Sequence, residues 1–269
     1  MIAGEFARTT PILARQRDYT EVRAKGLYLS PFLKHYSLMG SAHQDISDSL
    51  GFEIDGVYNK RKSNNRYALD SRGDPTFYGS TSYYDSQSFV VAPSLRWDFA
   101  DGWQARVAGM FGEDRTRYAF NVFVNGTLAS YQAGCYCNKA SSAEINVDGT
   151  VAQLPGGPAK IAIGGGFRRN DFHGYRTAGG TQNVKVSQDA YFAFGEASLP
   201  LIGPDQIGWL HRLTVNAALR YERYPDVDEV VTPKLGIILT PVEGFNLKGS
   251  WGKSFRAPTL FLVARLFLR

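Results

Sequence analysis

The stretch that decides the fold is VVTPKLGIILTPVEGFNLKGSWGKSFRAPTL, residues 230–260. Apolar and polar side chains alternate through two runs within it, residues 231–240 and 245–252, and a turn containing Glu243 and Gly244 separates the runs. Successive side chains of a β-strand point to opposite faces of the sheet, so the alternation predicts a β-hairpin with one apolar and one polar face. The SFRAP sequence at residues 254–258 follows and has no such period.

Alternating runs of the same kind recur upstream, and short turns join them in pairs. The predicted short turns lie near residues 45–48, 100–102, 155–158, 200–211 and 241–244. Long polar segments without a period, at 60–86, 113–143 and 171–187, and a brief link at 225–229 connect one pair to the next. The pattern gives about ten strands. Short turns that alternate with long loops are typical of outer-membrane barrels, whose short turns face the periplasm.

The two faces of the predicted strands differ in chemistry. The apolar face carries aromatic side chains near strand ends: Trp97, Phe99, Trp103, Tyr221, Tyr224, Phe245 and Trp251. The other face carries charges: Glu53, Asp55, Arg96, Arg106, Asp148, Arg220, Glu222, Lys234 and Lys248. Aromatic girdles at the membrane interfaces and a hydrated lumen account for both sets. A soluble β-sandwich gives the same alternation and is kept as an alternative.

Composition excludes two other classes of protein. The chain of 269 residues contains no run of about 18–20 apolar residues, which a membrane-spanning helix requires. Its net charge of +5 comes from interspersed acidic and basic residues, so nucleic acid is not a predicted partner. The first residues show no charged start followed by an apolar stretch, and we therefore predict no secretion signal within this sequence.

Residues 194–260 resemble the barrel of TonB-dependent outer-membrane receptors. The resemblance rests on SFRAP with its flanks, on the PKLG run at 233–236 and on the strand LTVNAALRYERY at 213–224. It implies energy-coupled uptake of a scarce ligand, such as a ferric siderophore, cobalamin or an oligosaccharide, across the outer membrane. It also implies outer-membrane lipid as a partner, a plug domain, and a TonB box in the full-length receptor.

The chain departs from this family pattern at its two ends. We find no plug, no TonB box and no signal, and LVARLFLR at 262–269 stands where the family continues with acidic residues. We therefore predict three segments: residues 1–33 without assigned structure, residues 34–260 as a partial antiparallel up-and-down transmembrane β-barrel, and residues 261–269 as a divergent tail. The expected product is a fragment of a receptor at the outer membrane that does not transport by itself.

No catalytic, metal or cofactor site is predicted, and the ligand-binding residues stay unknown. His35, His43, His173 and His211 are scattered, without a zinc or nucleophile motif, so we expect no enzyme activity. Glu53 and Asp55 share a face and could pair as carboxylates, but we interpret them as part of a solvated lumen face. Glycines 164–166 are expected to mark a bulge or bend in their strand.

Two further groups of residues leave alternatives open. The tyrosines of the long segments either bind a ligand or pack the loops together: Tyr78, Tyr83, Tyr84, Tyr118, Tyr131, Tyr136 and Tyr175. Arg256 of SFRAP either contacts a ligand or bonds to loop carbonyls. Cys135 and Cys137 are predicted to be unremarkable loop cysteines, with a bridge between them as the alternative in an oxidising compartment. A passive porin-like channel or surface-binding barrel is the remaining alternative for function.

Overall fold

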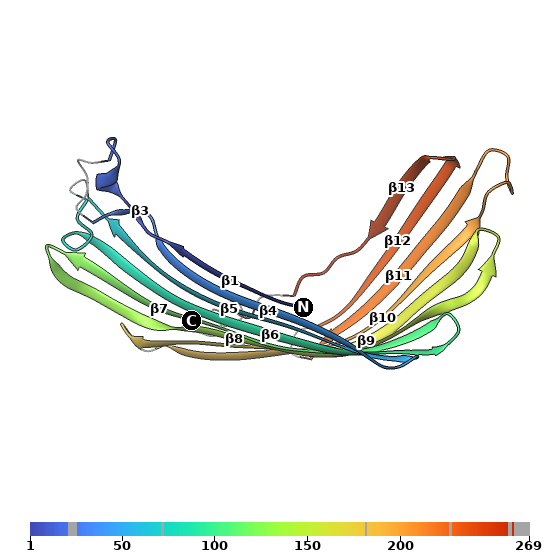
Figure 1. The fold of residues 1–269 in the computed structure, drawn as a ribbon, viewed down its shortest axis with the longest axis horizontal. Helices are drawn as coiled ribbons and strands as arrows, with labels where there is room; N and C mark the ends of the chain where they lie inside the picture. Colours follow the sequence, from blue (N-terminus) through green and yellow to red (C-terminus); the bar gives the residue numbers. More distant parts are fainter. Residues whose placement is uncertain (21–25, 71–72, 181, 226–227, 258–259, 261–269) are drawn as a thin grey trace.

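The computed structural model describes residues 1–20, 26–70, 73–180, 182–225, 228–257 and 260. Eleven strands form one antiparallel sheet in the order β1-β4-β5-β6-β7-β8-β9-β10-β11-β12-β13, in which every strand from β4 onward pairs with the next strand of the chain. Figure 1 shows them as one curved layer with β1 and β13 at its two edges. This up-and-down arrangement confirms the predicted all-β fold class.

Most strands of the sheet, β4 to β12, contain 13 to 28 residues and are much longer than the average strand of a soluble protein. Their bounds are β1 (Ile2–Thr9), β4 (Phe32–Ser47), β5 (Leu50–Ala68), β6 (Gly79–Ala100), β7 (Trp103–Val124), β8 (Thr127–Leu154), β9 (Gly157–Ala178), β10 (Asn183–Ile202), β11 (Arg212–Tyr224), β12 (Asp228–Val242) and β13 (Phe245–Gly252). Two short strands, β2 (Ile12–Leu13) and β3 (Tyr28–Ser30), pair with each other, and the 3-10 helix η1 (Ala14–Gln16) follows β2.

The predicted short turns are confirmed. They join β4 to β5, β6 to β7, β8 to β9 and β12 to β13, and residues 203–211 form a longer connection between β10 and β11. Gly102 and Gly244 stand in these turns with φ of 69° and 83°, a left-handed conformation that glycine adopts without strain. All of these connections lie at the same end of the strands, because consecutive strands alternate in direction.

The predicted long loops are wrong over most of their length. Strands β5 to β10 continue through residues 60–68, 79–86, 113–124, 127–143, 171–178 and 183–187, with pairs such as Arg117 opposite Cys135. The register shifts within these segments at Val122/Phe123 and at Ala133/Gly134, and pairing continues on both sides of each shift. Asn125 and Gly126 form a turn, with φ of 50° and 75°, that closes a hairpin of two very long strands. The period disappears there because neither face of these segments is apolar, while backbone pairing continues.

Each long strand divides into two parts. We call the part within about ten residues of the short turns the proximal half, because a tilted strand of that length crosses a bilayer. On β7 it comprises residues 103–112, and the remainder, residues 113–124, belongs to the distal half. β7 and β8 contain 22 and 28 residues, so each of them extends well past the length that a membrane needs.

The proximal half has a bare apolar face. Side chains such as Val107, Ile145 and Ile163 lie on it and are 49%, 52% and 54% exposed. A sandwich would cover this face with a second sheet, and among the described residues the only other sheet is the pair β2 and β3. The arrangement therefore contradicts the soluble sandwich and fits a lipid-facing wall.

The first 33 residues, for which no structure was predicted, contribute to the sheet. β1 pairs with β4 from Ile2 opposite Gly40 to Thr9 opposite Leu33. The predicted set of about ten strands corresponds to β4–β13, and β1 is the additional edge. The predicted tail, residues 261–269, lies outside the described residues.

Candidate functional site on the polar face of the sheet

The strand registers bring the predicted charges onto one face. Residues that oppose each other across neighbouring strands lie on the same face of the sheet. Following the registers from β5 to β13 places every predicted lumenal charge on the face opposite Val107, from Glu53 on β5 to Lys248 on β13. We call this the polar face.

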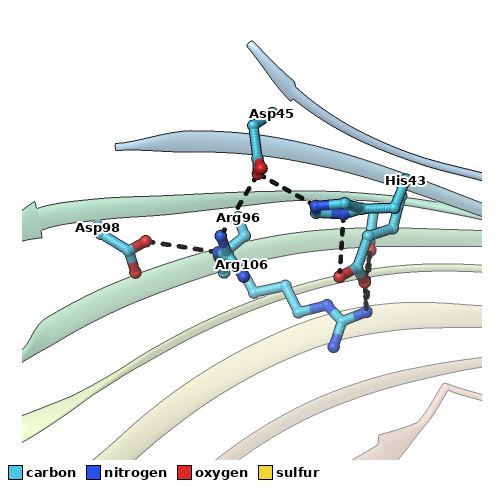
Figure 2. A network of polar contacts seen from close by, with 7 residues as sticks. His43, Asp45, Arg96, Asp98 and Arg106 are labelled. Carbon is cyan, nitrogen blue, oxygen red and sulfur yellow. Dashed lines mark hydrogen bonds and ion pairs between the residues drawn. The ribbon is translucent and has the colours of Figure 1, made fainter. Parts of the chain in front are cut away.

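A network of charged side chains lies on the polar face of β4–β7, near the short turns (Figure 2). Arg106 Nη2 donates to Glu53 Oε2 and to Ser94 Oγ, in both cases at 2.9 Å. His43 lies beside the same carboxylate, with Nδ1 3.7 Å from Glu53 Oε1. Glu53 therefore contacts an arginine on β7 and an imidazole on β4, which supports a solvated lumen face over the carboxylate pair with Asp55.

The network continues toward the short turn between β6 and β7. Arg96 Nε lies 3.4 Å from Asp98 Oδ2, and Arg96 Nη2 lies 3.8 Å from Asp45 Oδ1. Asp45 also contacts His43 Nε2 at 3.1 Å, so both parts share one carboxylate (Figure 2). The side chains are between 37% and 64% exposed, and exposed ion pairs of this kind contribute at most about 1 kcal/mol each. They make a hydrated, charged surface available to a ligand or a protein partner.

A second network lies on the same face of β9 and β11. Arg220 Nε donates to Glu222 Oε1 at 2.7 Å, and Arg168 Nη2 lies 3.7 Å from Glu222 Oε2. The Tyr224 hydroxyl donates to Glu222 and accepts a hydrogen bond from Arg168 Nη2 at 3.3 Å. Tyr224 is 5% exposed, so its predicted place in an interfacial girdle is wrong.

The SFRAP sequence meets this second network. The ring of Phe255 packs on Tyr224, with 5.8 Å between the ring centroids. Arg256 is exposed, and within the part of the chain that the structure describes it makes no hydrogen bond or ion pair. The aromatic residue of the motif, rather than its arginine, thus connects the segment after β13 to the sheet.

Glycines 164–166 make room for aromatic rings. The registers of β9 with β8 and β10 run through them without interruption, so the predicted bulge is wrong. A Cβ atom on Gly166 would lie 2.9 Å from the ring of Phe192, and one on Gly164 would lie 2.6 Å from the ring of Phe194. Arg220 then stacks on Phe192, with its guanidinium 4.4 Å from the ring centroid.

The distal tyrosines divide between the two faces. Tyr118 stacks on Tyr136 at 5.2 Å on the polar face, and Tyr136 stacks on Phe172 at 6.4 Å. The registers place Tyr84 on the same face, whereas Tyr83, Tyr131 and Tyr175 lie on the other face and Tyr78 lies in the connection between β5 and β6. The stacked rings pack strand against strand, and whether they also bind a ligand stays a prediction.

Two hollows open on the polar face. One, of about 840 Å³, is bordered by Lys160, Glu196, Lys234 and Lys248 in the proximal half. The other, of about 950 Å³, lies between the sheet and the segment after β13, and Tyr136, Arg168, Tyr224 and Ala257 border it. Neither was indicated by the sequence, because alternation identifies the face of a residue but not which side chains of distant strands meet.

Among the described residues, the two cysteines are bonded to each other and the histidines belong to no metal-binding group. Cys135 and Cys137 form a disulfide on β8, with 5.8 Å between their Cα atoms, so the prediction of unpaired loop cysteines is wrong. The pleat places residues i and i+2 on the same face, and this Cα distance lies within the usual range for a disulfide. Among the described residues no group of three or more His, Cys, Asp or Glu side chains is arranged to hold a metal ion.

Comparison with known proteins places this geometry in a family context. The family model described as "TonB dependent receptor-like, beta-barrel" matches residues 34–265. Four chains of solved structures match. One is the translocator domain of the autotransporter NalP from Neisseria meningitidis, 11% identical, with 83% of this chain and 75% of that chain covered and a TM-score of 0.39. Comparison with curated proteins gives no match. Within the described residues, no helix has the length and apolar character needed to cross a bilayer.

Proposed function

The chain belongs to the TonB-dependent receptor-like β-barrel family, and from that premise we propose that it is one wall of an outer-membrane receptor for energy-coupled uptake. The family match indicates an outer-membrane barrel. The single observation that supports uptake is the collection of charges and hollows on one face, which would line the lumen of a closed barrel. Ferric siderophores, cobalamin and oligosaccharides are the proposed classes of ligand, and catalysis has no part in the proposal.

We propose that the wall works together with further strands. β1 and β13 are not paired with each other in the described sheet, and unpaired backbone groups are costly in lipid. The first and last of eleven alternating strands run in the same direction. An all-antiparallel closed barrel therefore requires an odd number of additional strands. A second copy of this sheet in the same membrane orientation would not suffice, because its β1 would run parallel to β13 of the first copy. This requirement is why we do not expect the wall to transport by itself.

The proposed energy source is the TonB complex, which would engage the complete receptor. The test is uptake of a labelled ferric siderophore, cobalamin and an oligosaccharide by cells with and without the gene that encodes this chain. We expect uptake of one of the three to require the gene, to saturate with ligand concentration, and to stop when a protonophore or loss of TonB removes the energy supply.

The porin-like alternative gives a different result in the same assay. Uptake that rises linearly with external concentration and persists under the protonophore would overturn the receptor proposal. Replacing Lys160, Lys234 and Lys248 by glutamine tests the polar face, because these side chains border the proximal hollow. We expect this variant to bind the identified ligand more weakly while the protein still reaches the outer membrane.

A further inference from the structure

The apolar face changes character at a similar distance from the short turns on several strands. Along β7 its side chains are Trp103, Ala105, Val107, Gly109 and Phe111, and then Glu113, Arg115 and Arg117. On the same face, Tyr58 gives way to Lys60 on β5, and Ala143 gives way through Ser141 to Lys139 on β8. About ten residues of a tilted strand span the apolar band of about 25 Å. The charges therefore begin where lipid tails end.

Cations predominate on this part of the face. We call Lys60, Lys62, Arg115, Arg117, Lys139 and Lys185 the distal basic patch. Lys60, Arg115 and Lys185 belong to one cross-strand row that runs over β5–β10, and Lys62 and Arg117 belong to the next row. Within these rows the cations stand two or three strands apart, with Gln87 between Lys60 and Arg115 and Asp85 between Lys62 and Arg117.

Acidic side chains neutralise only part of the patch. Lys62 lies 3.6 Å from Asp85, and Arg115 pairs with Glu113. Lys60, Arg117, Lys139 and Lys185 form no ion pair with any residue that the structure describes. These four cations are available to an anionic partner, and all except the half-buried Lys60 are exposed.

A hollow of about 650 Å³ lies within the patch, over β7–β10. The Cys135–Cys137 disulfide is part of its lining, and Cys135 is 1% exposed. The longer side chains of Arg115, Arg117, Lys139 and Lys185 line the same hollow as the shorter side chains of the two cysteines. Glu113 and Asp171 also border the hollow, and each already pairs with an arginine, Arg115 and Arg169.

We propose that the distal basic patch binds the phosphate groups of lipid headgroups in the outer leaflet, with the hollow at the disulfide receiving one of them. Arginine donates to phosphate oxygens in a forked geometry, and lysine supplies a compact positive charge. A lipid suits this place because the patch continues the lipid-facing band without a gap, so bound acyl chains would lie along Phe111 and Val107. The patch lies on the opposite face from the charges proposed to line the uptake path.

The experiment is a titration of the purified full chain, in an uncharged maltoside detergent, with a fluorescent bisphosphorylated acylated disaccharide. Each cation near a charged membrane surface contributes about fivefold in affinity. The combined variant Arg117→Gln, Lys139→Gln and Lys185→Gln should therefore bind this lipid about 100-fold more weakly. Its matched control removes the same number of positive charges from the polar face, by replacement of Lys160, Lys234 and Lys248 with glutamine, and should bind within about twofold of the parent chain.

Three outcomes would overturn the proposal. The first is equal binding of the lipid by the parent and the distal variant. The second is equally tight binding of the same lipid after removal of its phosphates. The third is displacement of the lipid by inorganic phosphate at a matching phosphate concentration, which would indicate a free-anion site. The charge-conserving variant Arg117→Lys, Lys139→Arg and Lys185→Arg should retain binding, and its circular dichroism should match that of the glutamine variant, which excludes misfolding as the cause.

Discussion

The two halves of β7 and β8 have the same backbone pairing but different surroundings. In the proximal half Val107 opposes Ile145, and both project from a bare apolar face while Arg106 projects from the other. In the distal half Arg117 opposes Cys135 on one face and Tyr118 stacks on Tyr136 on the other. Neither distal face is a continuous apolar surface.

Backbone hydrogen bonding and the alternation of apolar and polar side chains are therefore separate properties of a strand. Pairing of backbone groups keeps the ladder intact wherever neighbouring strands continue together. Alternation exists only where the two faces meet different solvents, as lipid and water do in the proximal half. A projecting sheet with water on both sides keeps the first property and loses the second.

The largest expected effect comes from placing a charge in the middle of the lipid-facing band. Val107→Arg should destabilise the protein by about 2–4 kcal/mol in vesicles, because Val107 lies midway between the short turn and the charged rows. Ala119→Arg, on the same face and the same strand but in the distal half, should cost about 0–1 kcal/mol. Chemical unfolding in lipid vesicles measures both, and equal costs would remove the distinction between the halves.

Loss of the disulfide should have an intermediate and local effect. A bridge between residues two apart closes a very short loop, so the double replacement Cys135→Ser and Cys137→Ser should cost about 1.5 kcal/mol. Amide hydrogen exchange should become about tenfold faster in the distal parts of β7, β8 and β9, since that free energy corresponds to a factor of this size. Faster exchange by the same factor in the proximal parts would show instead that the two halves open as one unit.

The smallest expected effect concerns a connection outside the membrane. Asp74, between β5 and β6, accepts hydrogen bonds from the hydroxyl and the backbone N–H of Thr76, both at 2.8 Å. The side-chain hydrogen bond is the main cause that holds the pKa of Asp74 below its ordinary value. The resulting stability is present above the ordinary aspartate pKa and is lost as the pH falls through the lowered one.

A carbon-13 NMR titration of the Asp74 carboxyl checks this prediction. Thr76→Val should return the pKa toward the ordinary aspartate value, with a change in stability below about 1 kcal/mol because the connection is partly solvated. If Asp74 of the parent protein titrates at or above the ordinary aspartate value, the two hydrogen bonds from Thr76 are contradicted. Strand pairing in both halves should be unaffected, since the change is confined to one connection of the distal side.

The proximal half could be predicted from the sequence because lipid on one face and water on the other require apolar and polar side chains to alternate along each strand. Short turns, strand directions and the face of residues such as Glu53 and Lys248 all follow from alternation. The distal strands could not be predicted in this way, because polar residues on both faces look like a loop. The prediction for Tyr224 is wrong because it follows from the closeness of an aromatic side chain to a strand end, whereas the alternation along β11 puts Tyr224 on the polar face.

The sequence indicates on which face of the sheet the residues of the candidate site lie, but not which of them are in contact. Alternation indicates that Arg106 and Glu53 lie on the same side, but their contact depends on the register between β5, β6 and β7. Glycines 164–166 were interpreted as an irregularity, since the rings of Phe192 and Phe194 that need their space are contributed by the next strand. The disulfide remains only an alternative in the sequence analysis, because residues i and i+2 of a strand are expected to lie too far apart for an unstrained bridge, whereas the Cα distance found is 5.8 Å.

The most direct test of the central claim is the collision accessibility of spin labels placed singly along β7, at residues 103–121, in vesicles of protein that carries Cys135→Ser and Cys137→Ser. We predict that oxygen, which concentrates in lipid, reaches residues 105, 107, 109 and 111 preferentially, and that a water-soluble nickel complex reaches residues 106, 108 and 110. Beyond residue 113 the nickel complex should reach labels on both faces. Alternation that continues to residue 121, or water-like accessibility at Val107, would contradict a membrane wall with a projecting distal sheet.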